Sequence, residues 1–348
     1  MLVFLLLFST SLDYLIDGAR YIKYTTLPVI LLLWVATGFQ IKKPQTSTDI
    51  ALLLLVAWTL ISSTWGRLIY GIQDAFFIAT YAIPFVLLKD KKISIEHVFS
   101  GYTLFFFASL LARPLSTISI LESSTIAEGS GSFAFGAFSL YFLIKRRYLF
   151  FLLATFLLLI SLKRIALLGL IFCIILLLTP TKARKAVSTP WFVVVLNSSI
   201  VAALFLFSTG LFSDMVFELT GKSANAISMG RFLFYRDLFE DMQVNPATIL
   251  YGNGSGSAYS IVSQDYYGTT EKINLHSDTL KIFYDLGFIF FLVFFYKIAA
   301  QRNFYSSILI IYMSILFATD NILIYPEIMF IVLYISHQLN IEQALRHQ

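Results

Sequence analysis

The sequence predicts an all-α, polytopic integral membrane protein, and composition and the length of its apolar runs are the observations behind that prediction. Hydrophobic residues make up 58% of the 348 residues and charged residues 13%, and the mean hydropathy is +0.80. A soluble domain carries about 25% charged residues. The repeated apolar runs approach the ~20 residues that a helix needs to cross a bilayer. They are apolar all round, without the alternation of barrel strands, so we expect helices.

We expect about twelve transmembrane helices in a single transmembrane domain that comprises residues 1–348. The first run lacks a basic start and a small-residue cleavage site, so we interpret it as a short span and not as a signal peptide. The expected spans are approximately 1–12, 24–39, 49–65, 70–88, 95–112, 131–144, 148–162, 164–179, 190–211, 278–297, 303–319 and 321–339.

The basic residues predict the orientation of these spans. With the N-terminus inside, the inner loops hold fourteen Lys and Arg residues and the short outer loops hold six. This excess is the positive-inside bias of membrane proteins. It places one large loop, about 212–275, outside the membrane between the ninth and tenth spans. The bias also explains the net charge of +5 without nucleic-acid binding, because no polar segment carries a basic stripe with interleaved aromatics.

Disulfide and metal chemistry find little support in the sequence. The single cysteine, Cys173, lies inside an apolar run, so an internal disulfide is excluded. The predicted outer loops contain no paired-carboxylate motif for a metal. Asp13 and Asp17 are four residues apart, but we interpret them as part of a solvated turn. We therefore expect neither a metal nor another cofactor.

The outer loop contains a predicted amphipathic helix at about 228–243. At 100° per residue, its apolar side chains cluster on one face, and Arg231 falls within that face. Arg236 falls on the polar face and is expected to be solvated. Arg231 must then point toward protein or membrane, where it needs an anionic partner. The alternative is an interfacial arginine that snorkels to water.

Two adjacent cations, Lys163 and Arg164, occupy a predicted outer turn between two apolar runs. Their position on the outer side opposes the positive-inside rule, so we expect an anionic group on that side to stabilise the two cations. A bound phosphate is one candidate, and lipid headgroups are the alternative. The two side chains differ by about 100° around a helix, so only one of them can face inward.

His276 lies at the predicted start of the tenth span. Further along the same span, Gly287 would let a neighbouring helix approach closely. A helix N-terminus disfavours a cation, so the imidazole is expected to stay neutral and able to accept a proton. A satisfied interfacial histidine is the alternative.

The start of this span also carries a stripe of charge on the opposite side, formed by Asp278, Lys281 and Asp285. We expect Lys281 and Asp285 to form an i,i+4 pair with a structural role in preference to a relay. Glu327, which follows Pro326 in the last span, is a weaker candidate for a site.

Several of these motifs together resemble the O-antigen polymerase/ligase superfamily. The segment Ser161 to Leu168 is similar to the family's Ser-x-x-Arg-x-Ala-x-Leu. Three positions depart from the family pattern, since Ser277 replaces an Asn, Tyr235 replaces a Trp and Phe290 stands where a second Gly is common. The remaining motifs, in chain order, are Gly230-Arg231, Tyr235, Asn245-Pro246, the turn Gly252 to Gly256, His276-Ser277, Leu280 and Asp285-Leu286-Gly287.

The resemblance implies a GT-C-like glycosyltransferase that acts without metal. Its donor and acceptor would be oligosaccharides on undecaprenyl pyrophosphate, and the transfer would invert the anomeric centre. Arg164 and Arg231 would stabilise the leaving pyrophosphate with bidentate forks. His276 would deprotonate the acceptor hydroxyl as it attacks. Further substrate-binding residues are expected to be Lys163, Tyr235, Gly254 and Gly256.

The function predicted from this resemblance is polymerisation of O-antigen or another surface polysaccharide in lipopolysaccharide biosynthesis. The expected location is the bacterial inner membrane, with the active site facing the periplasm. Membrane lipids, a chain-length regulator and a flippase are the expected partners, and nucleic acid is not. The first alternative is a ligase that moves the polymer to a lipid core or another acceptor. The second is a flippase or transporter, although the paired broken helices and internal repeats typical of that class are not evident.

Overall fold

The computed structural model of the protein describes residues 46–111, 132–161, 163–228, 230–244, 246–263, 274–300 and 303–346, with a few positions between 25 and 35. All regular secondary structure in these residues is helical, as the sequence predicted. The first expected span and most of the second lie outside the described residues.

Ten longer helices correspond to the ten expected spans from residue 49 onward. Among the described residues, three of them (α4, α10 and α16) are long and apolar enough to cross a membrane, and five more are shorter apolar helices. The count of twelve spans stays a prediction. The ten are α3 (Ser47–Ser62), α4 (Leu68–Leu88), α5 (Ile95–Leu111), α6 (Ser132–Ile144), α7 (Tyr148–Ile160), α8 (Arg164–Leu178), α10 (Pro190–Ser208), α16 (Asp278–Ile298), α17 (Phe304–Thr319) and α18 (Pro326–Arg346), with a short α9 (Thr181–Val187) before α10.

Local sequence signals explain where several of these helices begin. Thr46 and Asp49 form a capping box at α3, each side chain accepting from the other residue's backbone N–H at 3.2 and 3.0 Å. Asn303 caps α17 by accepting the Ser306 N–H at 2.7 Å, and Ser277 caps α16 by accepting the Leu280 N–H at 3.3 Å. α10 starts with Pro190, whose missing N–H costs nothing in the first turn.

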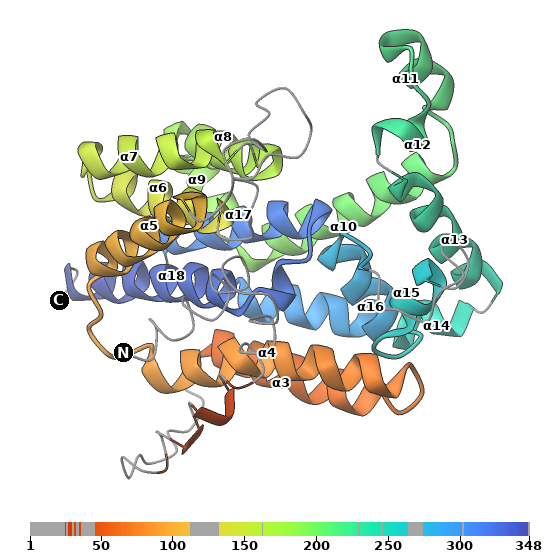
Figure 1. The fold of residues 1–348 in the computed structure, drawn as a ribbon, viewed down its shortest axis with the longest axis horizontal. Coiled ribbons are helices and arrows are strands. Elements are labelled where there is room, and N and C mark those ends of the chain that lie inside the picture. The colour runs from red at the N-terminus through yellow and green to blue at the C-terminus, as the bar shows by residue number, and fades with distance from the viewer. Residues whose placement is uncertain are drawn as a thin grey trace.

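The helices pack around a central group formed by α16, α17 and α18. In Figure 1, α6, α7 and α8 lie on one side of this group and α3 and α4 on the other. α16 packs against α3, α10 and α17, and α18 packs against α4, α6 and α17. The short helices of residues 213–261 gather at the end of the molecule opposite the C-terminus (Figure 1).

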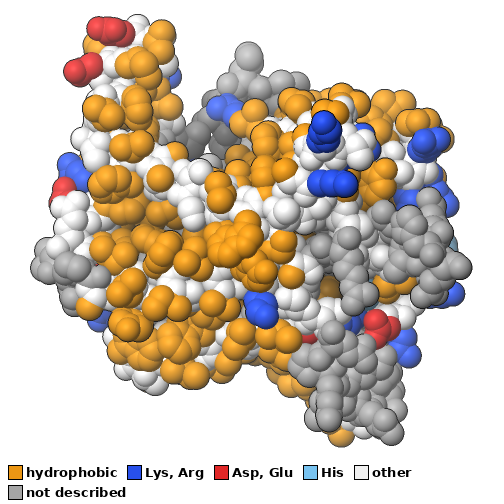
Figure 2. All heavy atoms as spheres, turned by 180° about the vertical axis from the view of Figure 1, so that it is seen from behind, with side chains coloured by type: hydrophobic (Ala, Val, Ile, Leu, Met, Phe, Trp, Pro, Cys, Tyr) orange, Lys and Arg blue, Asp and Glu red, His pale blue; other side chains and the backbone are white. Residues whose placement is uncertain are grey.

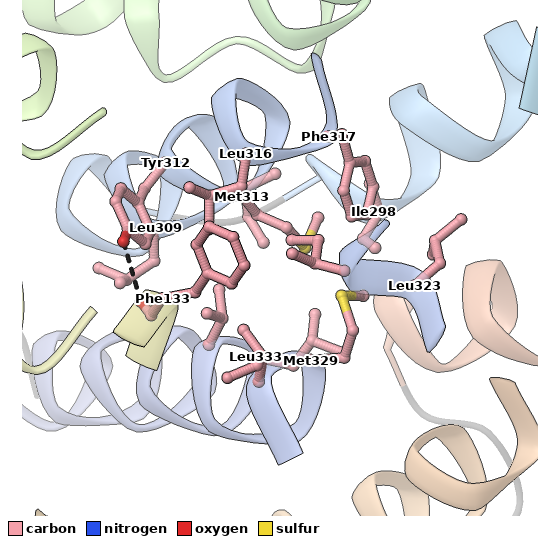
Figure 3. Packing of buried hydrophobic residues seen from close by; sticks show 14 of the residues in the cluster. Phe133, Ile298, Leu309, Tyr312, Met313, Leu316, Phe317, Leu323, Met329 and Leu333 are labelled. Carbon is pink, nitrogen blue, oxygen red and sulfur yellow. Dashed lines mark hydrogen bonds between the residues drawn. The ribbon is translucent and has the colours of Figure 1, made fainter. Parts of the chain in front are cut away.

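The interior between α6, α17 and α18 is almost entirely apolar. Met313, Leu316 and Met329 are completely buried there, and Figure 3 shows how their side chains fill the space between the helices. The one hydrogen bond drawn joins the Tyr312 hydroxyl to the Phe133 carbonyl at 2.9 Å, which satisfies a polar atom in this environment.

Large apolar side chains are also exposed on the outside of the bundle. Leu149 on α7 is 80% exposed, Leu178 on α8 is 79% exposed and Trp191 on α10 is 60% exposed. Figure 2 shows broad apolar areas on the face opposite to that of Figure 1. A protein that is apolar both inside and outside suits a lipid environment, because water would disfavour such continuous patches.

α16 is interrupted at Gly287, which has φ 84° and ψ 163°. The Trp58 indole donates to the Leu286 carbonyl at 3.2 Å, so an acceptor next to the break keeps a partner. A Cβ at Gly287 would overlap the backbone of Tyr251 and Gly252. The predicted close approach at Gly287 therefore occurs, and the approaching backbone is the C-terminal end of the short helix α14 (Pro246–Tyr251) with the adjoining Gly252.

Candidate active site at the break between α17 and α18

The segment 212–275, predicted to lie outside the membrane, folds into five short helices in its described part. They are α11 (Ser213–Thr220), α12 (Ala224–Ile227), α13 (Arg231–Val244), α14 (Pro246–Tyr251) and α15 (Ser257–Ile261). In Figure 1, α11 projects away from the bundle, whereas α13, α14 and α15 lie against it. The last three therefore connect this segment to the membrane helices.

α13 has the two faces that its sequence predicts. Tyr235, Leu238 and Met242 are buried, while Arg236 is exposed and pairs with the neighbouring Asp237 at 3.2 Å. Arg231 at the start of the helix is half-buried and donates from Nη1 to the Thr319 carbonyl at 3.1 Å. Arg231 thus points into the protein and reaches the C-terminal end of α17.

The polar link between α17 and α18 forms the floor of this region. α17 ends at Thr319, a short 3-10 helix, η5, covers Ile322–Ile324, and α18 begins at Pro326. Asp320 and Asn321 lie in the link, and the Asp320 carboxylate accepts the Asn321 N–H at 2.8 Å. The Asp320 carbonyl also accepts the N–H of Asp278 at 3.2 Å. A backbone hydrogen bond therefore connects the link between α17 and α18 directly to the first residue of α16.

His276 immediately precedes the N-cap of α16 and contacts this link. Its backbone is left-handed, with φ 58°, and its N–H donates to Asn321 Oδ1 at 3.1 Å. Its ring Nδ1 lies 3.4 Å from Asn321 Nδ2. Burial lowers the pKa of the His276 imidazole below its ordinary value, Arg231 and Lys163 lower it further, and Asp320 opposes them. The expectation of a neutral imidazole therefore agrees with its surroundings, although the dominant cause is burial and not the helix dipole.

Lys163 and Arg164 point in different directions, as their spacing required. The Lys163 ammonium lies 3.7 Å from an Asp320 carboxylate oxygen and 5.2 Å from the centre of the Phe133 ring. Arg164, the first residue of α8, is exposed and makes no hydrogen bond or ion pair with a described residue. Of the two cations, it is Lys163 that faces the group around Asp320.

Tyr235 lies beside the same group and is almost completely buried. Burial raises the pKa of Tyr235 to about 12, with Arg231 acting to lower it and Asp320 to raise it. Its hydroxyl therefore keeps its proton at neutral pH. We call Lys163, Arg231, His276, Asp320 and Asn321 the histidine cluster, and Tyr235 borders it.

The turn Gly252 to Gly256 has a structural use in the described protein. Gly252, Gly254 and Gly256 all have positive φ, between 83° and 88°, which a residue with a Cβ rarely adopts. The N–H of Gly254 donates to the Asp285 carbonyl at 2.9 Å, and that of Gly256 donates to the Asp285 carboxylate at 3.0 Å. A role of Gly254 and Gly256 in substrate binding stays a prediction, and it would have to use the shape of the turn and not these two N–H groups.

Lys281 and Asp285 do not form the expected i,i+4 pair. Lys281 pairs instead with Asp74 of α4 at 2.5 Å and lies 2.5 Å from the Tyr259 hydroxyl, which itself donates to Asp74 at 3.1 Å. All three side chains are buried. We call Asp74, Tyr259 and Lys281 the lysine cluster. The prediction was wrong about the partner of Lys281, and a structural role for Lys281 stays a prediction.

Sequence reasoning missed Asp320 and Asn321. Both were treated as the boundary between two spans, although two consecutive polar residues inside an apolar stretch are costly unless they have partners. Glu327, the weaker candidate, is buried at the start of α18. Asp13 and Asp17 lie outside the described residues.

The histidine cluster is suited to binding an anion. Two cations and a neutral imidazole surround a single carboxylate, so the cluster carries an excess of positive charge next to five N–H donors of an arginine fork. Among the described residues, no group of three or more His, Cys, Asp or Glu side chains could hold a metal ion. Arg231 and Lys163 are the two side chains of the cluster that could bind an anion directly.

The long apolar helices of the described residues and the large apolar side chains exposed on their outside are typical of an integral membrane protein. Comparison with protein families is more specific, since residues 149–295 are similar to the family model described as O-antigen ligase. Members of this family are polytopic membrane proteins that transfer glycan polymers. The match includes Lys163, Arg164, Arg231 and His276, whereas Asp320 and Asn321 follow it. No curated protein and no solved structure matches the chain.

Proposed function

We propose that this protein is a surface-polysaccharide polymerase, which transfers a growing glycan from undecaprenyl pyrophosphate to the next lipid-linked repeat unit. The observation that carries the proposal is the histidine cluster, which gathers two cations and a neutral histidine where the matched family domain meets the break between α17 and α18. A pyrophosphate leaving group needs cations that are already in position, because stabilisation of the developing charge lowers the barrier.

In the proposed reaction, the acceptor hydroxyl oxygen attacks the anomeric carbon of the donor, and the bond from that carbon to the pyrophosphate oxygen breaks. One displacement inverts the anomeric centre. Arg231 and Arg164 are the proposed arginine catalysts for the departing pyrophosphate, with Arg231 acting from inside and the exposed Arg164 from the solvent side. His276 is the third proposed catalytic residue. It acts next to the acceptor hydroxyl oxygen that attacks and the pyrophosphate oxygen that leaves.

Four residues are proposed to bind the substrate around these groups. Lys163 would hold a phosphate oxygen, and its position beside Asp320 at 3.7 Å supports this. Tyr235 would pack against the lipid-linked sugar beside Arg231. Gly254 and Gly256 would shape the loop that borders the site. We propose that no metal takes part, so EDTA should leave chain growth unchanged.

Ligation is the second candidate, and the description of the matching family favours it. A ligase would use the same donor chemistry but would pass the polymer to a lipid core or another acceptor. The donor side of the site, with Arg231, Lys163 and His276, serves both reactions equally. The acceptor is therefore the difference that an experiment has to measure.

Deletion of the gene followed by gel analysis of surface polysaccharide tests the two candidates. Loss of the ladder with a single repeat unit retained on the lipid core is the expected result for a polymerase. Accumulation of full-length lipid-linked polymer would instead identify a ligase. An unchanged ladder and no lipid-linked intermediate would contradict both.

We also propose that the cluster faces the periplasm of the inner membrane, because polyprenyl-linked repeat units are consumed there. Thr220 in α11 and Thr189 before α10 are both exposed, and the sole cysteine, Cys173, is buried. Thr220→Cys should react with a membrane-impermeant maleimide in intact spheroplasts, and Thr189→Cys should react only after permeabilisation. The reverse pattern would overturn the orientation.

A further inference from the structure

We infer that Asn321 is a positioning residue that holds His276 as the tautomer protonated on Nε2, so that the imidazole enters the reaction as a hydrogen-bond donor. This inference rests on the proposed function for the identity of the substrate, but the tautomer itself follows from contacts within the protein. It assigns a task to a residue outside the matched family domain.

The first step is the orientation of the Asn321 amide. The backbone N–H of His276 can only donate, so the atom of Asn321 that lies 3.1 Å from it has to be the carbonyl oxygen Oδ1. The other end of the amide is then the Nδ2 amino group, which carries two hydrogens and has no lone pair to offer. Asn321 is buried, with 2% of its surface exposed, so water does not compete for these contacts.

The second step is the state of the ring. Asn321 Nδ2 lies 3.4 Å from His276 Nδ1, and because Nδ2 donates, Nδ1 has to accept. A neutral imidazole that accepts at Nδ1 carries its proton on Nε2. No lone pair is then left on the ring to take a proton from a substrate. Protonation of Nδ1 would bring two N–H groups face to face.

The same amide also holds the backbone that carries the ring. His276 has φ 58°, which is uncommon for a residue with a side chain, and its N–H bond to Asn321 helps to keep it there. Asn321 is itself held by Asp320, which accepts its N–H at 2.8 Å. Backbone, ring and link between α17 and α18 therefore form one connected unit.

Three charged side chains from other segments of the chain face the His276 ring, and their combined effect favours the neutral imidazole. Arg231 comes from α13, Lys163 precedes α8, and Asp320 comes from the link between α17 and α18. The two cations and burial disfavour the imidazolium, while Asp320 favours it, and the pKa of His276 is lowered overall. Tyr235 keeps its proton and adds no charge.

These contacts change the role of His276 from the expected base to a donor. As the bond from the anomeric carbon to the pyrophosphate breaks, the electron pair moves to the pyrophosphate oxygen, and the Nε2–H of His276 would donate a hydrogen bond to it. The proton of the acceptor hydroxyl passes to the departing pyrophosphate, whose oxygens become basic as they gain charge. The histidine ends the step in the state in which it began.

A direct test is to determine the tautomer of His276 in the wild-type protein by NMR. The chain contains four histidines, His97, His276, His337 and His347, so 15N labelling of histidine in detergent-solubilised protein gives few signals, and His276→Gln identifies the one of interest. The expected spectrum of neutral His276 shows a bare Nδ1 and a protonated Nε2. A protonated Nδ1 in the neutral ring would overturn the inference, whatever reaction the protein catalyses.

The variant Asn321→Asp tests the consequence for chain growth. A carboxylate accepts from Nδ1–H, so it should raise the pKa of His276 and leave Nε2 bare in the neutral ring. Chain growth should then fall about 10²-fold as the pH rises through that pKa, because a donor is lost. If His276 were a base, the variant would instead gain activity as the pH rises, and the inference would be wrong.

Asn303→Asp is the matched control, because Asn303 caps the other end of α17 and does not contact His276. Its pH profile should follow that of the wild type. Should Asn321→Asp not fold, the 15N spectrum of the wild type still decides the question. Absence of chain growth in the wild type, with the expected tautomer present, would reject the proposed function while leaving the role of Asn321 intact.

Discussion

The histidine cluster and the lysine cluster both lie near the start of α16, but their charged groups are paired differently. In the lysine cluster, the ammonium, the carboxylate and the phenol are each within hydrogen-bonding distance of the other two, and all are buried. In the histidine cluster, Arg231 donates to the Thr319 carbonyl, and the Lys163 ammonium lies 3.7 Å from an Asp320 carboxylate oxygen. Its histidine and its two cations are only partly buried, whereas Asp320 and Asn321 are buried.

Under the proposed function, the lysine cluster stabilises the fold and the histidine cluster binds the substrate. A buried ion pair with all its hydrogen bonds made has nothing left to offer a substrate, and removal of one partner leaves an uncompensated charge. A half-open cluster with excess positive charge can bind an anion without breaking existing bonds. Perturbation of the two clusters should therefore produce loss of stability in one and loss of activity in the other.

The largest expected effect on activity comes from His276. His276→Ala should lower the rate of chain growth about 10³-fold while the protein stays folded, because it removes a hydrogen-bond donor to the developing oxyanion. Purified enzyme with a lipid-linked oligosaccharide would measure growth, and donor binding would be measured separately. His337→Ala on α18 is the control, and near-normal growth by His276→Ala would remove the residue from the mechanism.

Arg231 should come next. Arg231→Ala removes the inward-facing fork, and loss of one such donor to a developing oxyanion costs about 10²- to 10³-fold in rate. Arg236 lies on the exposed face of the same helix and pairs with Asp237, so Arg236→Ala should remain close to wild type. Equal losses in the two variants, at equal expression, would show that the two faces of α13 are not functionally distinct.

The lysine cluster should respond in stability. Lys281→Met leaves Asp74 as an unpaired charge in the bundle, and breaking one such pair costs about 3–5 kcal/mol. The double variant Asp74→Asn with Lys281→Met should recover much of that loss, because the lone charge is gone. Thermal unfolding in detergent measures both. A Lys281→Met protein that unfolds like the wild type but makes no polymer would move this cluster into the mechanism.

The smallest expected effect is at the border of the histidine cluster. Tyr235→Phe keeps the buried ring and removes only the hydroxyl, so chain growth should fall about two- to tenfold, the value of one ordinary hydrogen bond. Tyr235→Ala serves as the comparison, since it also removes the packing. A loss as large as that of Arg231→Ala would make the hydroxyl a direct participant in the reaction.

Much of the architecture could be predicted from the sequence because membrane helices are encoded locally. Each expected span from residue 49 onward coincides with a helix, and the buried face of α13 follows from a period of 3.6 residues. The different directions of Lys163 and Arg164 were also expected, because the two residues are adjacent in the chain. These features need only neighbours in the chain.

Long-range partners could not be predicted in this way. Lys281 had a plausible partner four residues away in Asp285, but its partner is Asp74, 207 positions distant in the chain. Asp285 instead accepts the N–H groups of Gly254 and Gly256, two residues that were expected to bind the substrate. Asn321 gains its importance only from the folding of the link between α17 and α18 against His276, and no local pattern contains that information.

The junction of Gly287 with the turn at Gly252 bears on where this protein tolerates new sequence. A peptide inserted between Gly252 and Gly256 would separate groups that fit backbone against backbone, and there is no room even for a methyl group at Gly287. Gly221, by contrast, ends α11 in an exposed position with open space around its Cα. An epitope tag placed at Gly221 should be accepted without loss of function, which makes that tip of α11 the natural handle for purification and imaging.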